Sequence, residues 1–197
     1  MSRNPLTLVP AVAVLFTVAN LSTSDPLWSR VIASWPDTAK TTAMEIAQKY
    51  GPPDIVGGDL LVWENVAPYV WIRVNSEEVH HNFPVEHKDV LDIAIPYKVP
   101  VSMHAKVAEF DGSAMIMRTQ GLLVASCFKE GLDIAILNLA NDVVRGEKTP
   151  AEERMAFAKV AMGMMNGEKN PYTEALQFET EPLSATRVPD KPFKMKM

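Results

Sequence analysis

Three of the four histidines lie close together in the segment 77–89, which reads EEVHHNFPVEHKD. Imidazole nitrogens and carboxylate oxygens are donors by which proteins hold zinc, copper or iron, so His80, His81, Glu86 and His87 form a candidate transition-metal site. The spacing matches no zinc-enzyme motif such as HExxH. In an extended segment His80 and His81 point to opposite faces, and only a bend would bring both to one ion.

We therefore favour a solvated loop between two strands for this segment and keep the metal site as an alternative. A catalytic acid–base pair is a further alternative, in which one of these histidines works with Glu86 or Asp89. The sequence contains no motif that places a nucleophile beside such a pair.

Two other groups offer sulfur ligands. A methionine cluster near the end of the last predicted helix has the soft thioethers that hold copper(I). The same residues form a stripe at helical spacing, and we interpret it as core packing; its members are Met155, Ala158, Met162 and Met165. The single cysteine, Cys127, stands among apolar residues and is interpreted as a buried, inert thiol.

The composition excludes several classes of function. The chain has 197 residues, of which 47% are hydrophobic and 22% charged, as in ordinary globular proteins. A net charge of −5 without a basic cluster argues against a nucleic-acid partner. One cysteine excludes an internal disulfide and a zinc site built on cysteines. The phosphate-binding glycine motifs and the GxSxG motif of serine hydrolases are absent from the sequence.

The hydrophobic periodicity predicts an α+β fold. A helix followed by a hairpin occurs twice, over 37–75 and 102–128, and an extra antiparallel strand lies between these units. Pro96 in the extra strand suggests a sheet edge. Two C-terminal helices pack on the units, and the second opens with a capping box at Thr149. We expect helices over 37–50, 102–110, 130–145 and 149–166, and strands over 60–64, 69–75, 90–98, 114–118 and 122–128.

Further segments flank the α+β domain, which we expect over 37–166. Residues 1–21 carry an uncharged apolar run behind Arg3 and predict a signal peptide or an uncleaved membrane anchor; a core helix of a cytoplasmic protein is the alternative. Residues 22–36 are expected to be a linker. Residues 167–197 are punctuated by prolines and lack periodicity, so we expect an extended arm that makes few contacts with the core.

One part of the chain resembles a known family. Residues 43–75 are similar to the helix–turn–hairpin unit of small envelope lipoproteins that assist outer-membrane protein assembly. The residues that carry the resemblance are Gly51, Pro53, Asp54, Trp63 and Trp71. The lipid-bearing cysteine of that family is missing here. The whole chain also resembles uncharacterised exported bacterial proteins of about this size, and neither resemblance implies a catalytic residue.

These observations favour a non-catalytic protein without a cofactor. We expect an accessory or structural subunit that docks on a larger envelope or energy-transducing membrane complex, respiratory or photosynthetic. The N-terminal segment and the C-terminal arm would make the contacts, on the periplasmic face of a bacterial membrane, or in the periplasm if the segment is cleaved. One alternative is an exported metal-binding protein or metalloenzyme that uses the 77–89 segment and a transition-metal ion. Another is a small-ligand binder with a pocket between sheet and helices.

Overall fold

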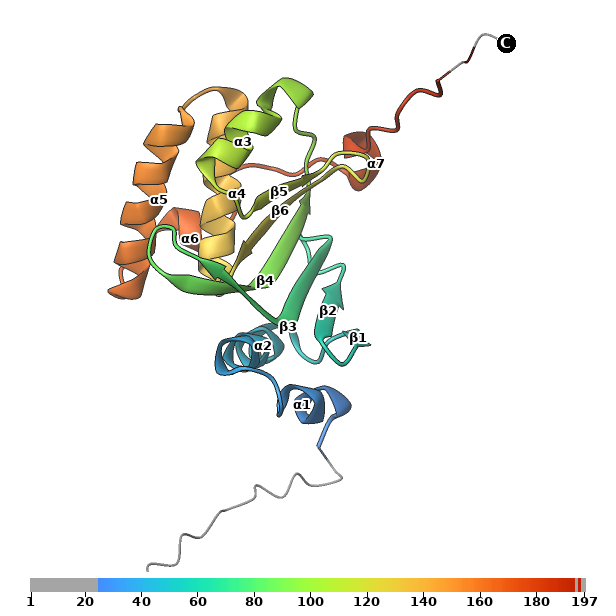
Figure 1. The fold of residues 1–197 in the computed structure, drawn as a ribbon, viewed down its shortest axis with the longest axis vertical. Helices are drawn as coiled ribbons and strands as arrows, with labels where there is room; N and C mark the ends of the chain where they lie inside the picture. The colour runs from blue at the N-terminus through green and yellow to red at the C-terminus, as the bar shows by residue number, and fades with distance from the viewer. Residues whose placement is uncertain (1–24, 194, 196–197) are drawn as a thin grey trace, which may run out of the picture.

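The computed structural model describes residues 25–193 and residue 195, which form a six-stranded antiparallel sheet with helices packed on it (Figure 1). The strand order is β1-β2-β3-β4-β6-β5, and the predicted α+β class is confirmed. The strands are β1 (Ile55–Val56), β2 (Leu60–Glu64), β3 (Trp71–His81), β4 (His87–Pro96), β5 (Ala114–Met117) and β6 (Leu122–Cys127). The helices are α1 (Leu27–Ile32), α2 (Asp37–Tyr50), α3 (His104–Phe110), α4 (Glu130–Arg145), α5 (Pro150–Met165), α6 (Pro171–Glu174) and α7 (Leu183–Thr186), with a 3-10 turn at Val101–Met103.

Both predicted helix–hairpin units are present, and β4 joins them in one sheet. Helix α2 precedes the β2–β3 hairpin, and α3 precedes the β5–β6 hairpin. Strand β4 pairs with β3 on one side and with β6 on the other, so it is a central strand. The expectation of a sheet edge at Pro96 is therefore wrong. Pro96 is the last residue of β4, opposite Leu122, where a missing N–H disturbs the hydrogen-bond ladder least.

The main hydrophobic core joins α2, α3, α4 and α5 to the sheet. In β4 the alternating residues Leu91, Ile93 and Ile95 are fully buried in this core. Figure 1 shows α3, α4 and α5 gathered at one end of the sheet, and α1 and α2 at the other end. A second, smaller cluster contains residues from β4, β6 and α7, namely Ala94, Leu122, Val124 and Leu183.

Helix α5 begins as predicted but faces the core with different residues. Its capping box is confirmed: the backbone N–H of Glu152 donates to Thr149 Oγ1, and the backbone N–H of Thr149 donates to Glu152 Oε2. Phe157 and Ala161 are buried against the core. The expectation that the methionine stripe packs in the core is wrong, because Met155, Met162 and Met165 are each more than half exposed.

The C-terminal arm is anchored to the domain through α4. The side chain of Asn138 donates to the carbonyls of Tyr172 and Ala175 and accepts from the backbone N–H of Gln177, at 2.8–3.0 Å. Thr186 is only 1% exposed and lies against the β5–β6 turn. The expectation that the arm makes few contacts with the core is therefore wrong. A polar residue in a mostly apolar helix satisfies the backbone of a segment without periodicity of its own.

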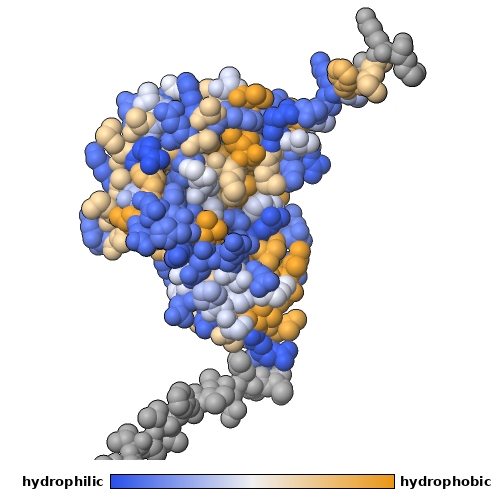
Figure 2. All heavy atoms as spheres, in the orientation of Figure 1, coloured by the Kyte–Doolittle hydropathy of each residue, from blue (hydrophilic) through white to orange (hydrophobic). Residues whose placement is uncertain are grey.

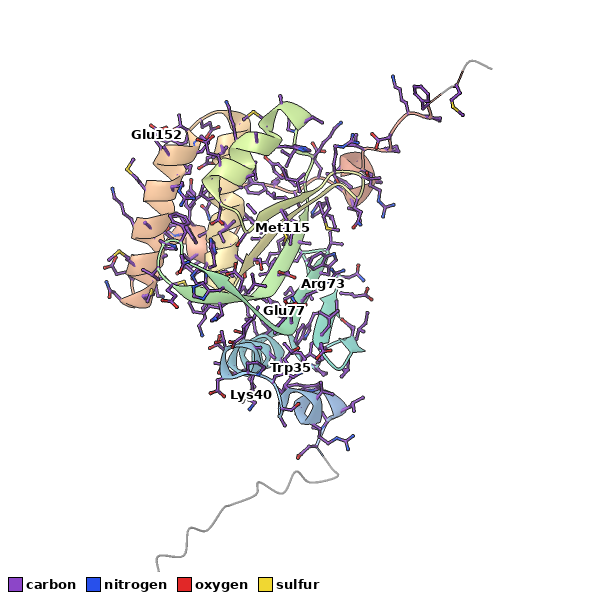
Figure 3. All side chains as sticks on the ribbon, in the orientation of Figure 1. Trp35, Lys40, Arg73, Glu77, Met115 and Glu152 are labelled. Carbon is purple, nitrogen blue, oxygen red and sulfur yellow. The ribbon has the colours of Figure 1, made fainter. Side chains whose placement is uncertain are left out.

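The N-terminal expectations fall partly outside the described residues. Residues 1–21, interpreted as a signal peptide or anchor, lie there with the first part of the linker. The rest of the linker forms α1 and the turn to α2, where Trp35 lies (Figure 3). Trp35 is buried, and its indole N–H donates to the Gly58 carbonyl at 2.8 Å. Among the described residues, the helices are all too short or too polar to cross a membrane.

The anchoring of the arm predicts two different outcomes for two truncations. A chain that ends after residue 167 loses the partners of the Asn138 side chain and uncovers part of α4, so its thermal midpoint should fall by at least about 5 °C. Among the polar contacts of the described residues, a chain that ends after residue 187 loses one ion pair, Arg118 with Asp190, and it should keep its midpoint. Thermal denaturation followed by circular dichroism measures both. Equal midpoints for the two truncations would contradict this role of the arm.

Candidate metal centre

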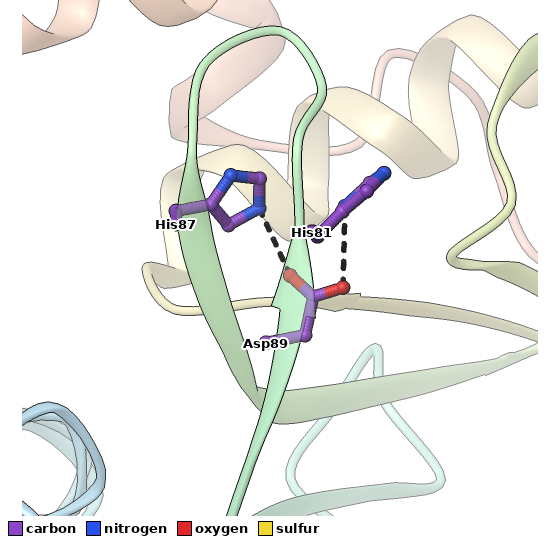
Figure 4. A group of neighbouring side chains, drawn as sticks. All are labelled: His81, His87 and Asp89. Atoms are coloured by element: carbon purple, nitrogen blue, oxygen red, sulfur yellow. Dashed lines mark ion pairs between the residues drawn. The ribbon is translucent and has the colours of Figure 1, made fainter.

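The β3–β4 hairpin brings two of the predicted ligands together at its end. His81 lies directly opposite His87, and Asp89 lies opposite Val79, two residues further along β4. The segment between the strands is a short turn over residues 82–86. The expectation of a loop over 77–89 is therefore wrong, because both strands continue to the histidines (Figure 4).

A bulge in β3 decides which histidine faces the site. The register shifts between the pairs Val74–Leu91 and Val79–Asp89. Between these pairs β3 has three residues more than β4. In the sheet the even-numbered residues Ile72 and Val74 face the core. Because the shift is odd, His81 takes the inner position and His80 the outer one.

Beyond the bulge the hairpin is a two-stranded ribbon. Strand β2 pairs with β3 only up to Asn75, and β6 pairs with β4 only from Leu91 onward. Contacts from the turn fix the end of the ribbon on α5: the ring of Phe83 lies 5.7 Å from that of Phe157, and the Arg154 guanidinium stacks on Phe83 at 3.7 Å. The hairpin end is thus held by side chains rather than by further strands.

The carboxylate of Asp89 stands between the two imidazoles (Figure 4). Its Oδ1 lies 2.9 Å from His87 Nε2, and its Oδ2 lies 3.2 Å from His81 Nδ1. One ligand atom from each of the three residues lies within 4.8 Å of the others. The Asp89 side chain is 4% exposed and that of His81 20%, so the group is buried with one side open to solvent.

The ring of His87 is held so that Nε2 faces inward. Its Nδ1 lies 2.8 Å from the Val85 carbonyl, which can only accept, so Nδ1 carries a proton. The ring of Phe128 packs beside it at 5.3 Å. Cys127 Sγ lies 3.6 Å from Nε2. This orientation, with one nitrogen bonded to a carbonyl and the other directed at Asp89, is the one that metal-bound histidines adopt.

A second set of polar groups comes from the turn between α3 and β5. Ser113 Oγ donates to Asp89 Oδ2 at 2.6 Å and lies 3.3 Å from His81 Nδ1. Asp111 is fully buried, and its Oδ1 accepts from the Ser113 backbone N–H and lies 3.9 Å from His81 Nε2. The imidazole of His81 therefore lies between two buried carboxylates.

The other two predicted ligands lie outside this group. His80 Nε2 is 3.0 Å from Asn82 Oδ1 and 3.7 Å from Glu86 Oε1, on the outer side of the ribbon. The side chains of His80 and Glu86 are 46% and 73% exposed. The structure brings together His81, His87 and Asp89. Sequence reasoning named Asp89 only as a catalytic partner, although its alternation with His87 along a strand would have placed both on one face.

Burial and neighbouring charge shift the pKa values of several groups here. For His87, burial opposes the charged form, but the hydrogen bonds to Asp89 and Val85 outweigh it, and the pKa is raised. Burial raises the pKa of Asp111. Asp133 of α4 is fully buried with neither carboxyl oxygen hydrogen-bonded, and burial, then the charges of Asp92 and Asp89, raise its pKa well above the usual value.

A cavity between helices bears on the alternative prediction that the protein binds a small ligand. It has a volume of about 560 Å³ and lies among α4, α5 and α6, where Leu139, Glu153 and Tyr172 line it. This cavity lies between helices, whereas the sequence suggested a pocket between sheet and helices. Ligand binding stays a prediction.

Comparisons with known proteins add no relative: the chain matches no family model, no curated protein and no solved structure. The resemblances described above therefore stay predictions, and the function must be argued from the site itself.

The raised pKa of His87 predicts how stability depends on pH in the metal-free protein. A histidine whose pKa is higher in the folded state adds stability below its unfolded pKa of 6.5, and this is lost as pH rises through the folded value. The stability difference between the natural protein and His87→Gln should therefore be larger at about pH 6 than at about pH 8. Urea unfolding at both pH values measures it. His80→Gln, on the outer side, is the control, and an equal difference at both pH values would contradict the expectation.

Proposed function

We propose that the protein binds one divalent transition-metal ion through His81, His87 and Asp89. The observation that carries the proposal is the environment of Asp89 Oδ1. This oxygen is buried and has no hydrogen-bond donor aligned with it, yet it lies 2.9 Å from His87 Nε2. Because the Nδ1 proton of a neutral His87 is given to Val85, Nε2 then presents a lone pair to this oxygen. A second proton on His87 or a metal ion bound to both atoms resolves the conflict, and we propose the metal ion.

The charges around the site support the same proposal. Asp89 and Asp111 are 4% and 0% exposed, and burying charged carboxylates without positive partners is costly. Two added protons on the histidines would offset two negative charges, and so would one divalent ion bound to neutral imidazoles. Metal and protons therefore compete for this site, and metal affinity should fall as the pH is lowered.

The donor set restricts the metal. Two imidazole nitrogens and one carboxylate suit zinc and iron(II) better than magnesium or calcium, which prefer oxygen ligands. The partly exposed side of His81 gives an ion or a water molecule access to the site. Ser113, which donates to Asp89, orients the carboxylate in the way that outer hydrogen bonds orient metal ligands.

Zinc titration of the metal-stripped full-length protein, followed by calorimetry, tests the proposal. We expect about one equivalent to bind at neutral pH, and His81→Ala, His87→Ala and Asp89→Asn each to weaken binding by more than about 100-fold, beyond the cost of losing a hydrogen bond to a ligand. Matched controls come from the outer side of the same ribbon: His80→Ala and Glu86→Gln should bind as the natural protein does. The absence of stoichiometric binding, or equal losses in the control variants, would overturn the proposal.

We also propose a role as an accessory subunit of a membrane complex on the periplasmic face of a bacterial membrane. The observation that favours it is the end of the arm, which leaves the domain after α7 (Figure 1) and extends away from its surface (Figure 2). Phe193 and Met195 are 90% and 79% exposed there. These two apolar side chains bury little surface against the domain and are therefore free to contact a partner. The apolar run in residues 1–21 would supply the second contact.

The end of the arm can be tested without disturbing the fold. The chain that ends after residue 187 should remain folded but should lose co-purification with its complex from gently solubilised membranes. Phe193→Ser with Met195→Ser should act in the same direction, and Arg187→Ala, next to α7, is the control. Unchanged co-purification of both altered proteins would contradict an arm-mediated contact.

A further inference from the structure

We infer that Cys127 is the fourth ligand of the metal ion, which makes the site a closed two-histidine, aspartate and cysteine centre. The inference rests on the metal site proposed above. Cys127 is the last residue of β6, is 1% exposed, and has its Sγ 3.6 Å from His87 Nε2. The chain has no other cysteine.

The distance between these two atoms is compatible with a shared ion. In a tetrahedral zinc site the nitrogen lies about 2.0–2.1 Å and the sulfur about 2.3 Å from the metal, which separates nitrogen and sulfur by roughly 3.6 Å. The observed separation is 3.6 Å. A weak thiol–imidazole hydrogen bond gives the same separation in the metal-free protein, so the thiol already stands where a shared ion would place it.

A second, independent observation points to the same place. The register pairs Cys127 with Leu91, and Asp89 and His87 follow at two-residue steps along β4. Residues at such steps share one face of a strand. The Asp89 oxygen that lacks an aligned donor is the one beside His87 Nε2, so it and Cys127 Sγ both lie beside this nitrogen.

Closure around the ion requires one adjustment. Cys127 is not among the atoms that all lie within 4.8 Å of one another, so its Sγ and a ligand atom of His81 or Asp89 must approach each other. His81 is the last residue of β3 and the most exposed of the three proposed ligands His81, His87 and Asp89. Its movement disturbs the core least, because the ribbon has no further strand beside it.

A cysteine ligand changes which metals the site selects. Thiolate sulfur favours zinc and cobalt over magnesium, calcium and manganese, whose preferred ligands are oxygens. The interpretation of Cys127 as an inert thiol would then hold only for the metal-free protein.

Cobalt(II) distinguishes this inference from the metal site itself. Visible d–d absorption reports tetrahedral cobalt whatever the ligands, whereas a near-ultraviolet sulfur-to-cobalt charge-transfer band requires a thiolate ligand. We expect the full-length protein loaded with one equivalent of cobalt to show both. Cys127→Ser should keep cobalt binding but lose the charge-transfer band and bind at least about 10-fold more weakly. Ser126→Ala, one residue earlier on β6, should keep the band and is the control.

The outcomes separate the two proposals. One equivalent of bound cobalt that depends on Asp89 but shows no charge-transfer band would overturn the role of Cys127 and leave the three-residue site intact. A band that persists in Cys127→Ser would also overturn it. Failure of the natural protein to bind cobalt would overturn both. Thermal denaturation of metal-free Cys127→Ser shows whether the variant folds, and Cys127→Ala gives a second variant with a different side chain.

Discussion

The burial of carboxyl groups in one region of the core is the constraint on which the rest of the structure depends. Asp89, Asp111 and Asp133 are all 4% exposed or less, and burial, with smaller contributions from the charges of the first two, raises the pKa of the third. Buried acids of this kind must be neutralised by protons, imidazoles or a cation. The histidines of the hairpin and the Ser113 hydroxyl contact Asp89. The proposed metal ion would supply positive charge at the same place.

The regular elements could be predicted because their signals are local. Helix α2 was expected over 37–50 and α4 over 130–145, and both have those bounds. In each, the apolar residues repeat at helical spacing and a glycine follows the last turn. The β5–β6 hairpin was found from two short apolar runs around a turn. Asn138 was noticeable only as a polar residue in an apolar helix, and its partners lie more than 30 residues away.

The site could be predicted only in part. His81 and His87 were among the expected ligands, but the register shift that turns His81 inward leaves no signal in a single sequence. Simple alternation from Val74 would have placed His80 inside instead. Asp111 and Ser113 reach the site because the α3–β5 turn lies over the hairpin, which is a tertiary arrangement and not a pattern of spacing. The extent of the arm's packing was hidden for the same reason.

The isolated ribbon at the end of the hairpin has a consequence for cooperativity. A two-stranded ribbon is marginally stable on its own, so residues 79–89 can open as a local unit while the six-stranded sheet stays intact. Among the described residues, the contacts of Phe83 with α5, the ring of Phe128 beside His87 and the side chains around Asp89 oppose that opening. An ion held between the ribbon and β6 would join this unit to the globally unfolding core. Amide hydrogen exchange in the ribbon would then slow from the rate of local opening toward that of whole-domain unfolding. The exchange rate of the ribbon amides would therefore report whether the site is occupied.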